Sequence, residues 1–201
     1  MTLILDMGSA NTCKNDKRII ERMIREVGEV VSDRHEVILK WQLFYNAPPN
    51  IPLTFESFRY AYTLADHLCF ETTASVFDIE SMRFLMGFRV PFVKIANRPD
   101  LYHLAKHSTV PVYLSSALSG FNIPNTLTLA CISKYPATLE DYELSFNAED
   151  MHHVSDHTAG WGLYRKWYPS ILEKHFVHER SDSNPDAGPF AVTPKELAEV
   201  M

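Results

Sequence analysis

Short apolar or β-branched runs recur along the whole chain, and amphipathic or loop-like segments separate them. Eight of these runs have the length and composition of strands. Their regular alternation with connecting segments predicts a parallel sheet, and eight repeats predict that this sheet closes into a barrel. The predicted strands cover residues 3–7, 36–41, 68–72, 92–96, 110–115, 127–133, 152–155 and 171–176.

The strongest helix signals lie in the first half of the chain. Residues 17–31 carry apolar side chains at helical spacing with charged residues between them, as in an amphipathic helix. Residues 54–67 and 79–87 also fit helices, and Asp78 is a suitable N-cap for the second of these. Residues 100–107 have room for two turns.

Connections in the second half are thinner. Residues 116–126 contain glycine and proline and have the composition of a loop. Residues 140–146 and 163–168 allow one or two turns each, and residues 193–201 begin with a Thr-Pro pair that suits a helix start. We predict a compact (β/α)8 TIM barrel with shortened or missing helices in its second half, as a single domain over residues 1–201. A small doubly wound sheet is the alternative fold.

Short helices predict that part of the apolar barrel wall lacks its usual cover. Four aromatic residues crowd the place where the seventh helix is expected, namely Trp161, Tyr164, Trp167 and Tyr168. This face is predicted to be buried against another subunit, which would make the protein a homo-oligomer such as a dimer. The other interpretation is that these side chains patch the protein's own core.

Composition narrows the class of protein. Hydrophobic residues make up 46% and charged residues 22% of the 201 residues, and the net charge is −6. This acidic balance argues against a protein that coats nucleic acid or an anionic membrane. No stretch approaches the length of a membrane span, and the N-terminus lacks the basic start of a signal peptide. Three scattered cysteines form no disulfide framework, which favours a cytoplasmic location.

Polar residues follow almost every predicted strand, and in such barrels function gathers at these strand ends. Lys40 and Lys94 would supply charge for a phosphate or carboxylate. His157 and His175 follow neighbouring strands and could hold a divalent metal while leaving positions open for water or substrate. For any single histidine or lysine, a hydrogen-bonded or solvated side chain is the simpler interpretation. Strand alternation places Glu173 and His175 on one face and Lys174 on the other.

Several motifs resemble the sialic acid (N-acetylneuraminate) synthase family. They occur in the family's order over nearly the whole chain: "VILKWQ", "FDIESMRFL", "VPFVKIAN", "VYLSSA", "SKYPATLEDYEL", "VSDHTAGWG", "ILEKHFVHERSDSNPD" and "TPKELAEVM". The resemblance implies condensation of phosphoenolpyruvate with an N-acetylated amino sugar in its open-chain aldehyde form. It also implies a divalent metal, Mn²⁺ or Mg²⁺, that polarises the aldehyde oxygen.

The resemblance assigns roles to individual residues. His157 and His175 match the metal ligands, and Lys40 and Lys94 match the lysines that hold phosphoenolpyruvate. Glu173, Lys94 and Asp6 are the catalytic candidates, of which Glu173 would transfer a proton or orient the sugar. The remaining matches are contacts to the two substrates: Gln42, Thr73, Asn97, Ser115, Ser133, Tyr135, Ser155 and Asp186.

Departures from the family pattern gather on the sugar side. Asp6 stands where the family has a glutamate, Ser133 where an asparagine is usual, and Asn97 where a serine is usual. The "GPDH" loop reads "NPDA" here and loses its histidine. The chain stops at Met201, so we expect it to lack the family's antifreeze-like domain. The acceptor sugar is therefore expected to differ from the usual one, or a partner chain to complete its site.

Two other functions stay open at this point. A metal barrel with lysines could run another aldolase or lyase reaction on a pyruvate-like anion. Alternatively, the chain could be a degenerate, non-catalytic barrel that serves as a binding or assembly subunit.

Overall fold

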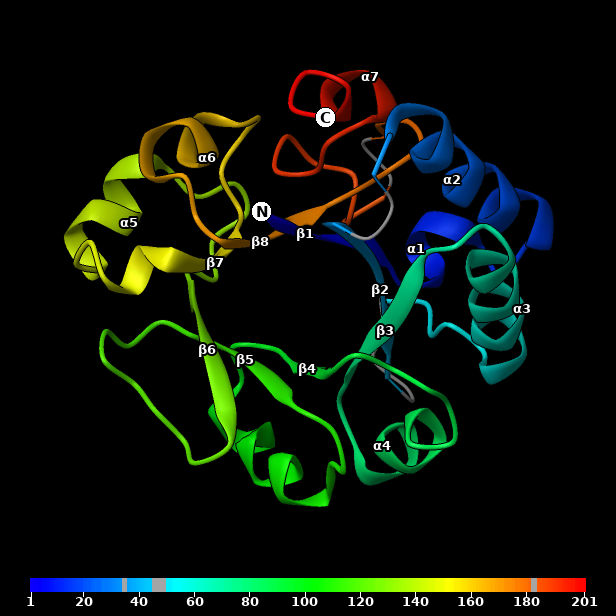
Figure 1. The fold of residues 1–201 in the computed structure, drawn as a ribbon, viewed down its shortest axis with the longest axis horizontal. Coiled ribbons are helices and arrows are strands. Elements are labelled where there is room, and N and C mark those ends of the chain that lie inside the picture. The colour runs from blue at the N-terminus through cyan, green and yellow to red at the C-terminus, as the bar shows by residue number, and fades with distance from the viewer. Residues whose placement is uncertain (34–35, 45–49, 182–183) are drawn as a thin grey trace.

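A computed structural model of the protein describes residues 1–33, 36–44, 50–181 and 184–201 (Figure 1). Residues 182–183 of the "ERSDSNPD" motif lie outside this description. Eight parallel strands pair in chain order and close into a barrel, with the last strand beside the first. The predicted barrel is confirmed, and the doubly wound sheet is wrong. The strands are β1 (Thr2–Gly8), β2 (Val37–Leu43), β3 (Glu71–Val76), β4 (Val93–Ile95), β5 (Val112–Ser116), β6 (Thr126–Cys131), β7 (His153–Asp156) and β8 (Ile171–His175).

Helices surround the barrel on its outside (Figure 1). Within the described residues, α2 and α3 have 14 and 13 residues, whereas α5 and α6 have only 7 and 6. The predicted shortening in the second half is thus confirmed. None of these helices combines the length and apolar character needed to cross a bilayer. The helical elements are α1 (Ala10–Cys13), α2 (Lys17–Val30), α3 (Phe55–His67), α4 (Ile79–Leu85), the 3-10 helix η2 (Pro99–His107), α5 (Leu139–Ser145), the 3-10 helix η3 (Asp150–His152), α6 (Gly162–Trp167) and α7 (Pro194–Leu197).

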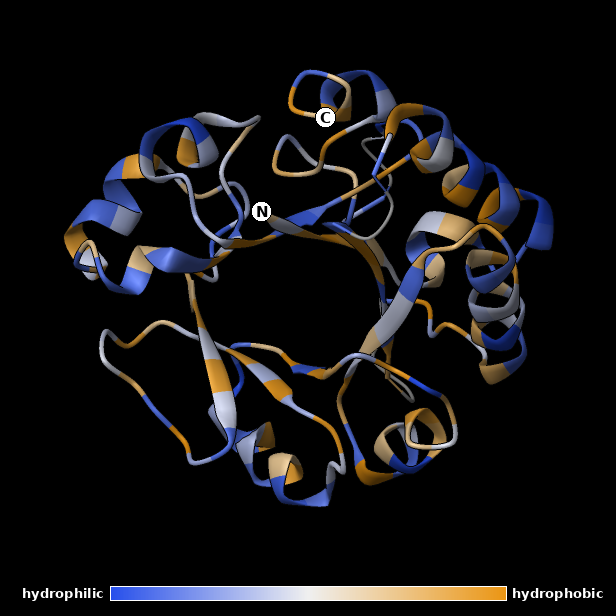
Figure 2. Cartoon of the chain, viewed as in Figure 1, coloured by the Kyte–Doolittle hydropathy of each residue, from blue (hydrophilic) through white to orange (hydrophobic). Residues whose placement is uncertain are grey.

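Local sequence accounts for where these helices begin and which face they bury. Asp78 accepts a hydrogen bond from the Ser81 N–H (2.7 Å) and begins α4 as predicted. The apolar stripe of α2 is fully buried against the barrel and comprises Ile20, Met23, Ile24 and Val27. Figure 2 shows hydrophilic and hydrophobic residues alternating along this helix. The amphipathic pattern therefore fixes how α2 packs.

The third strand begins later than predicted. Residues 68–72 were expected to form it, but β3 spans Glu71–Val76. The apolar residue Leu68 instead ends α3, where its N–H donates to the Leu64 and Ala65 carbonyls. Cys69 then turns the chain with a left-handed φ of 64°. Leu68 and Phe70 are thus part of the helix end, and the strand pattern was assigned too early in the chain.

The inside of the barrel has two layers. Ile4, Ile38 and Phe92 form an apolar cluster, against which Tyr113 and Ile171 pack. Two residues further along each of these strands, alternation brings a polar side chain to the same inner face. The polar layer therefore lies above the apolar one, toward the carboxyl ends of the strands, and contains Asp6, Lys40, Lys94, Ser115 and Glu173.

The wall between β5 and β6 is covered by a loop instead of a helix (Figure 1). We expected a short-helix barrel to leave apolar wall uncovered, but the outward residues here include Thr126 and Thr128. Their hydroxyls donate to the carbonyls of Ile123 (2.8 Å) and Phe121 (2.9 Å) in the covering loop. A loop without regular secondary structure can cover this part of the barrel, because the threonine hydroxyls donate hydrogen bonds to the loop's carbonyl groups.

The aromatic cluster near α6 divides between core and surface. Trp161 is buried, and its indole N–H donates to the Glu196 carbonyl (2.7 Å). Tyr164 and Trp167 are half-buried against the core, whereas Tyr168 is 70% exposed. Trp161 therefore patches the protein's own core. Burial of this face against a second subunit stays a prediction.

Candidate functional site

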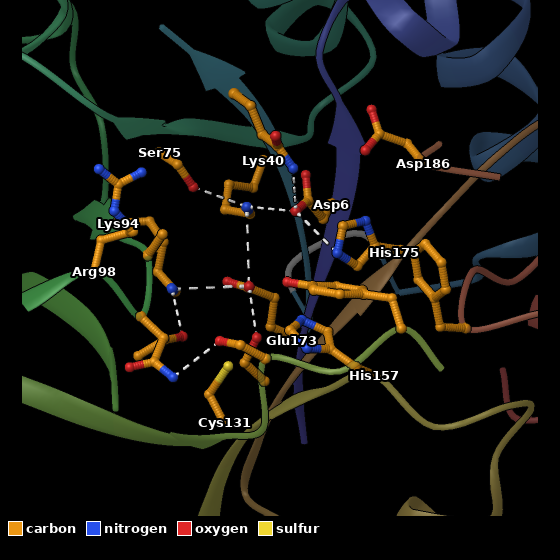
Figure 3. A pocket seen from close by; sticks show the side chains of 18 of the residues that line it. Asp6, Lys40, Ser75, Lys94, Arg98, Cys131, His157, Glu173, His175 and Asp186 are labelled. Carbon is orange, nitrogen blue, oxygen red and sulfur yellow. Dashed lines mark hydrogen bonds and ion pairs between the residues drawn. The ribbon is translucent and has the colours of Figure 1, made fainter. Parts of the chain in front are cut away.

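A cavity of about 380 Å³ opens at the carboxyl ends of the strands (Figure 3). This size lies within the range of small-molecule sites. It brings together every candidate residue from the sequence except Thr73, and these come from both halves of the barrel. The candidates that line it are Asp6, Lys40, Gln42, Lys94, Asn97, Ser115, Ser133, Tyr135, Ser155, His157, Glu173, His175 and Asp186.

Lys40 and Asp6 form a buried ion pair on one wall. Lys40 Nζ lies 2.7 Å from Asp6 Oδ2 and 2.9 Å from Ser75 Oγ. Burial acts to raise the pKa of Asp6, but the charges of Lys40 and His175 outweigh it and lower that pKa. Asp6 also accepts hydrogen bonds from Gln42 Nε2 (2.9 Å) and the Gly8 N–H (3.0 Å). The Asp6 oxygens therefore already accept hydrogen bonds from the protein, and they can accept few more from a ligand.

Lys94 reaches the cavity from β4, two strands further around the barrel than Lys40 (Figure 3). Its Nζ donates to Ser115 Oγ (2.6 Å) and to the Ile95 carbonyl (3.0 Å), and it lies 3.8 Å from Glu173 Oε1. Burial lowers the pKa of Lys94, although Glu173 opposes the shift. Because its hydrogen-bonded partners are neutral, this ammonium is the better placed of the two lysines to attract a ligand's negative charge.

Glu173 lies between the two lysines. Its Oε1 accepts from Ser155 Oγ (2.9 Å) and lies 3.9 Å from Lys40 Nζ. Its Oε2 is buried and has no hydrogen-bond partner among the described residues. A buried carboxylate oxygen without a partner is unfavourable by itself, which indicates a position that a ligand or water would fill.

The two histidines face one another across the top of β7 and β8, with ring centroids 5.5 Å apart. His157 Nδ1 lies 2.6 Å from the Ile132 carbonyl, which can only accept, so Nδ1 carries the proton and Nε2 keeps its lone pair. Burial, helped by the charge of His175, lowers the pKa of His157 to about 3. His175 has its Nε2 3.7 Å from Asp6 Oδ2, and its buried Nδ1 lacks a partner among the described residues.

These residues fit a divalent metal held by few protein ligands. A neutral imidazole with a free lone pair is the form that binds metal, and a carbonyl on its other nitrogen is the usual way to orient it. Among the described residues there is no cluster of three or more histidine, cysteine or acidic side chains arranged for a metal ion. Any ion here would therefore take its remaining ligands from water or substrate.

Residues that the family resemblance assigned to the sugar, such as Asp186, make weaker contacts within the protein. Among the residues that the structure describes, the contacts of Asp186 Oδ2 are long, with Ser9 Oγ (3.4 Å) and Asn11 Nδ2 (3.3 Å). The Tyr135 ring lies over His157 with centroids 4.2 Å apart, and Phe190 packs edge-on against it. Asn97 Nδ2 donates to Ser133 Oγ (3.0 Å), so two residues that depart from the family pattern bond to each other.

Thr73 does not line the cavity, contrary to expectation. Its hydroxyl donates to the Phe92 carbonyl at the level of the apolar layer. Ser75 is two residues further along β3 and occupies the place expected for Thr73. With the correct boundaries of β3, strand alternation would have identified Ser75 as a cavity residue. The same rule identifies Cys131 on β6.

Other lining residues carried little sequence signal. Arg98 follows β4 and makes a bidentate ion pair with Asp100 (2.9 and 2.7 Å) at the cavity rim. Pro185 and Phe190 come from the irregular segment after β8, which periodicity cannot place. Phe77 and Ala96 complete the lining.

A family model described as NeuB family matches residues 10–201 of the chain. The chain belongs to the NeuB family. This confirms the family resemblance read from the motifs. No curated protein matches the sequence at a significant level.

Solved structures confirm the barrel. An N-acetylneuraminic acid (sialic acid) synthetase from Leptospira borgpetersenii serovar Hardjo-bovis, in complex with citrate, is 21% identical with a TM-score of 0.77. The match covers 98% of this chain and 80% of that one. Spore coat polysaccharide biosynthesis protein spsE from Bacillus subtilis is 18% identical with a TM-score of 0.70, covering 98% and 65%. A DAHP synthase from Thermotoga maritima is 11% identical with a TM-score of 0.68, covering 99% and 67%. At these identities the likeness establishes the fold alone.

Proposed function

We propose that this protein is a metal-dependent synthase that condenses phosphoenolpyruvate with N-acetylmannosamine or a related amino sugar. The products would be a nonulosonic acid and phosphate. Membership of the NeuB family supports a sugar-acid synthase, as does the fold shared with a sialic acid synthetase. The observation that carries the proposal is the convergence of two buried lysines, two histidines and one glutamate in a single cavity: Lys40, Lys94, His157, Glu173 and His175.

Phosphoenolpyruvate is proposed to bind between the two lysines. Lys94 offers a buried ammonium with neutral hydrogen-bond partners, and Lys40 adds a second ammonium near the same oxygen of Glu173. Ser75 and Ser115 place hydroxyl groups beside these ammonium groups, and Ser155 donates to the neighbouring Glu173. Buried cations together with hydroxyl donors suit a small polyanion that carries both phosphate and carboxylate.

His157 and His175 are the residues that would hold Mn²⁺ or Mg²⁺. A bound ion of this kind acts as a Lewis acid on the aldehyde oxygen of the sugar. His157 contributes a neutral imidazole held in one orientation by the Ile132 carbonyl. His175 contributes a buried ring with one nitrogen unpaired among the described residues.

The proposed reaction makes one carbon–carbon bond and breaks one carbon–oxygen bond. C3 of phosphoenolpyruvate attacks the aldehyde carbon, and the former carbonyl oxygen takes up a proton. Water adds at C2, the bond from C2 to the phosphate oxygen breaks, and phosphate leaves a keto acid. The water must lose its protons during this addition. Glu173 Oε2, which is buried and unpaired among the described residues, is placed to accept one of them or to orient the sugar.

The sugar is proposed to lie toward Gln42, Tyr135 and Asp186. Asp186 is the freest carboxylate there, because its contacts within the protein are long. Asp6 is instead paired with Lys40, so we assign it to the lysine and not to a sugar hydroxyl. Free Cys13, Cys69 and Cys131 suit a reducing compartment such as the cytoplasm. That location, like a dimeric state, stays a prediction.

Phosphate release with a panel of aldoses tests the function. The protein would be incubated with phosphoenolpyruvate and Mn²⁺, with and without each sugar. We expect release only with an accepted aldose, and a product whose mass equals both substrates plus water minus phosphoric acid. Glu173→Gln is the inactive control. Release without sugar would favour another reaction on a pyruvate-like anion. No release with any aldose, while Mn²⁺ binding is confirmed, would favour the non-catalytic subunit.

A further inference from the structure

A second buried ion pair lies outside the barrel wall, behind the two histidines. Lys174 Nζ is 2.8 Å from Asp156 Oδ2, and both side chains are completely buried. Strand alternation turns Lys174 away from the cavity, whereas its neighbours Glu173 and His175 line it. The proposed reaction uses neither member of this pair.

The pair has a defined position in the barrel ladder. Asp156 and Lys174 are register partners across β7 and β8, and each comes one residue before a cavity histidine. Asp156 Oδ1 also accepts from the Thr158 N–H (2.7 Å), and Lys174 Nζ donates to the Thr158 carbonyl (2.5 Å). The ion pair therefore ties the backbone of Thr158, which follows His157, to Asp156, which precedes it.

Tyr142 of α5 also forms hydrogen bonds with the backbone around His157. Its buried hydroxyl donates to the Ser155 carbonyl (2.6 Å) and accepts from the His157 N–H (3.2 Å). The His157 carbonyl in turn accepts from the Ala137 N–H (2.8 Å). Both backbone polar groups of His157 are thus fixed, and none of the side chains that fix them enters the cavity.

Stability alone does not account for this arrangement. Burying two charges is unfavourable, and their attraction offsets the loss of hydration only with good geometry. A well-packed apolar pair of similar volume would stabilise the barrel at least as well. What an ion pair adds is a directional link between two specific strand positions.

We propose that Asp156, Lys174 and Tyr142 are positioning residues that set the placement of His157 relative to His175 and so determine metal affinity. The inference rests on the proposed function for its metal, but not for the geometry of His157. Groups that hydrogen-bond the ring of a metal-binding histidine typically change affinity by about 10- to 100-fold when they are removed. These three residues act through the backbone around His157 instead, so we take this range as the upper bound of their effect.

The double variant Asp156→Leu/Lys174→Met tests this, because it leaves no unpaired buried charge. The matched control is Arg165→Met/Glu199→Gln, which removes an exposed ion pair of 3.1 Å. In metal-free protein, side-chain ¹⁵N NMR should show His157 as the single Nδ1–H tautomer in the parent and control. The double variant should show an averaged tautomer. Calorimetry should show Mn²⁺ binding weakened, by at most about 10- to 100-fold, with phosphoenolpyruvate affinity unchanged in the absence of metal.

The outcomes separate this inference from the proposed function. A folded double variant with the parent's tautomer and Mn²⁺ affinity overturns the inference. If the parent itself binds no Mn²⁺, the proposed function fails, and the tautomer measurement still decides the positioning role. If the double variant does not fold, Tyr142→Phe decides instead, since it removes only one hydroxyl. We expect it to shift both readouts in the same direction, and no shift in either would overturn the inference.

Discussion

Lys94 is unusual among the charged residues because its ammonium is buried with neutral oxygens as its hydrogen-bonded partners. Ser115 and the Ile95 carbonyl accept its hydrogen bonds, and Glu173 is the nearest negative charge at 3.8 Å. Lys40 differs, because Asp6 compensates its charge directly at 2.7 Å. The two lysines are therefore not equivalent. Lys94 should respond more strongly to an incoming anion, and Lys40 should mainly organise the wall around Asp6.

Lys94→Met should weaken phosphoenolpyruvate binding by roughly 10- to 100-fold, because a charge-assisted hydrogen bond is lost. Mn²⁺ affinity should stay within about threefold of the parent, since Lys94 makes no contact with either histidine. Calorimetry with each ligand separately measures both effects. Lys106→Met, at an exposed position, is the control. Equal loss of both ligands would indicate misfolding instead of a lost contact.

Most candidate residues could be found from the sequence because they lie at predicted strand ends and in motifs that resemble the family, and strand alternation added which face a side chain occupies. It separated Glu173 and His175 from Lys174 without any structure. Thr73 was assigned by the family resemblance, but its hydroxyl lies at the level of the apolar layer, and Ser75, two residues further along β3, lines the cavity instead. Arg98 and Phe190 lie on irregular backbone, where no periodicity exists to place them.

At the scale of elements, α7 and the segment before it act together. Glu196 accepts two hydrogen bonds from Arg180 (2.6 and 2.7 Å) and caps its own helix through Thr193. Arg180 also donates to the Gly188 and Ala191 carbonyls, on either side of Phe190. This network fixes the segment that brings Asp186 and Phe190 to the cavity. The sequence predicted the Thr-Pro helix start but could not predict these tertiary contacts, because their partners lie up to 16 residues apart.

Glu196→Gln should lower the free energy of unfolding by about 1 kcal/mol at neutral pH, because the ion pair with Arg180 is lost while the cap remains. Burial acts to raise the pKa of Glu196, but hydrogen bonds from Thr193 and Arg180 outweigh it and lower that pKa from 4.5. The carboxylate therefore stabilises the fold above pH 4.5, and this contribution is lost as pH falls through the lowered pKa.

Urea unfolding at a series of pH values measures this effect. The difference between parent and Glu196→Gln should be constant above pH 4.5 and should narrow at lower pH. Glu199→Gln, in an exposed pair with Arg165, is the control and should show a smaller difference. A difference that widens on acidification would contradict the assignment.

At the scale of the whole molecule, the closed barrel joins the cavity to global stability. His157 directly follows β7 and His175 ends β8, and β8 is the strand that closes the ring against β1. A ligand that bridges these strands binds only the folded protein, so it must raise the melting temperature by mass action. The eightfold strand pattern made this architecture predictable. The register between β1 and β8 could not be predicted, because it depends on pairing between the two ends of the chain.

Mn²⁺ at 100 times its dissociation constant should raise the melting temperature by roughly 5–11 °C relative to chelator-treated protein. His175→Ala should remove this shift while the metal-free protein still melts cooperatively. His107→Ala, at an exposed position away from the cavity, should keep the full shift. Differential scanning calorimetry measures all three. An undiminished shift in His175→Ala would show that the ion binds elsewhere.

The apolar layer beneath the cavity affects the order in which two ligands can bind. Ile4, Ile38 and Phe92 lie below Lys40 and Lys94, so the cavity has an apolar floor and opens toward the carboxyl ends of the strands. In the proposed reaction, both substrates would enter from that side. The one that lies deepest, beside the lysines, is then expected to bind first and to leave last.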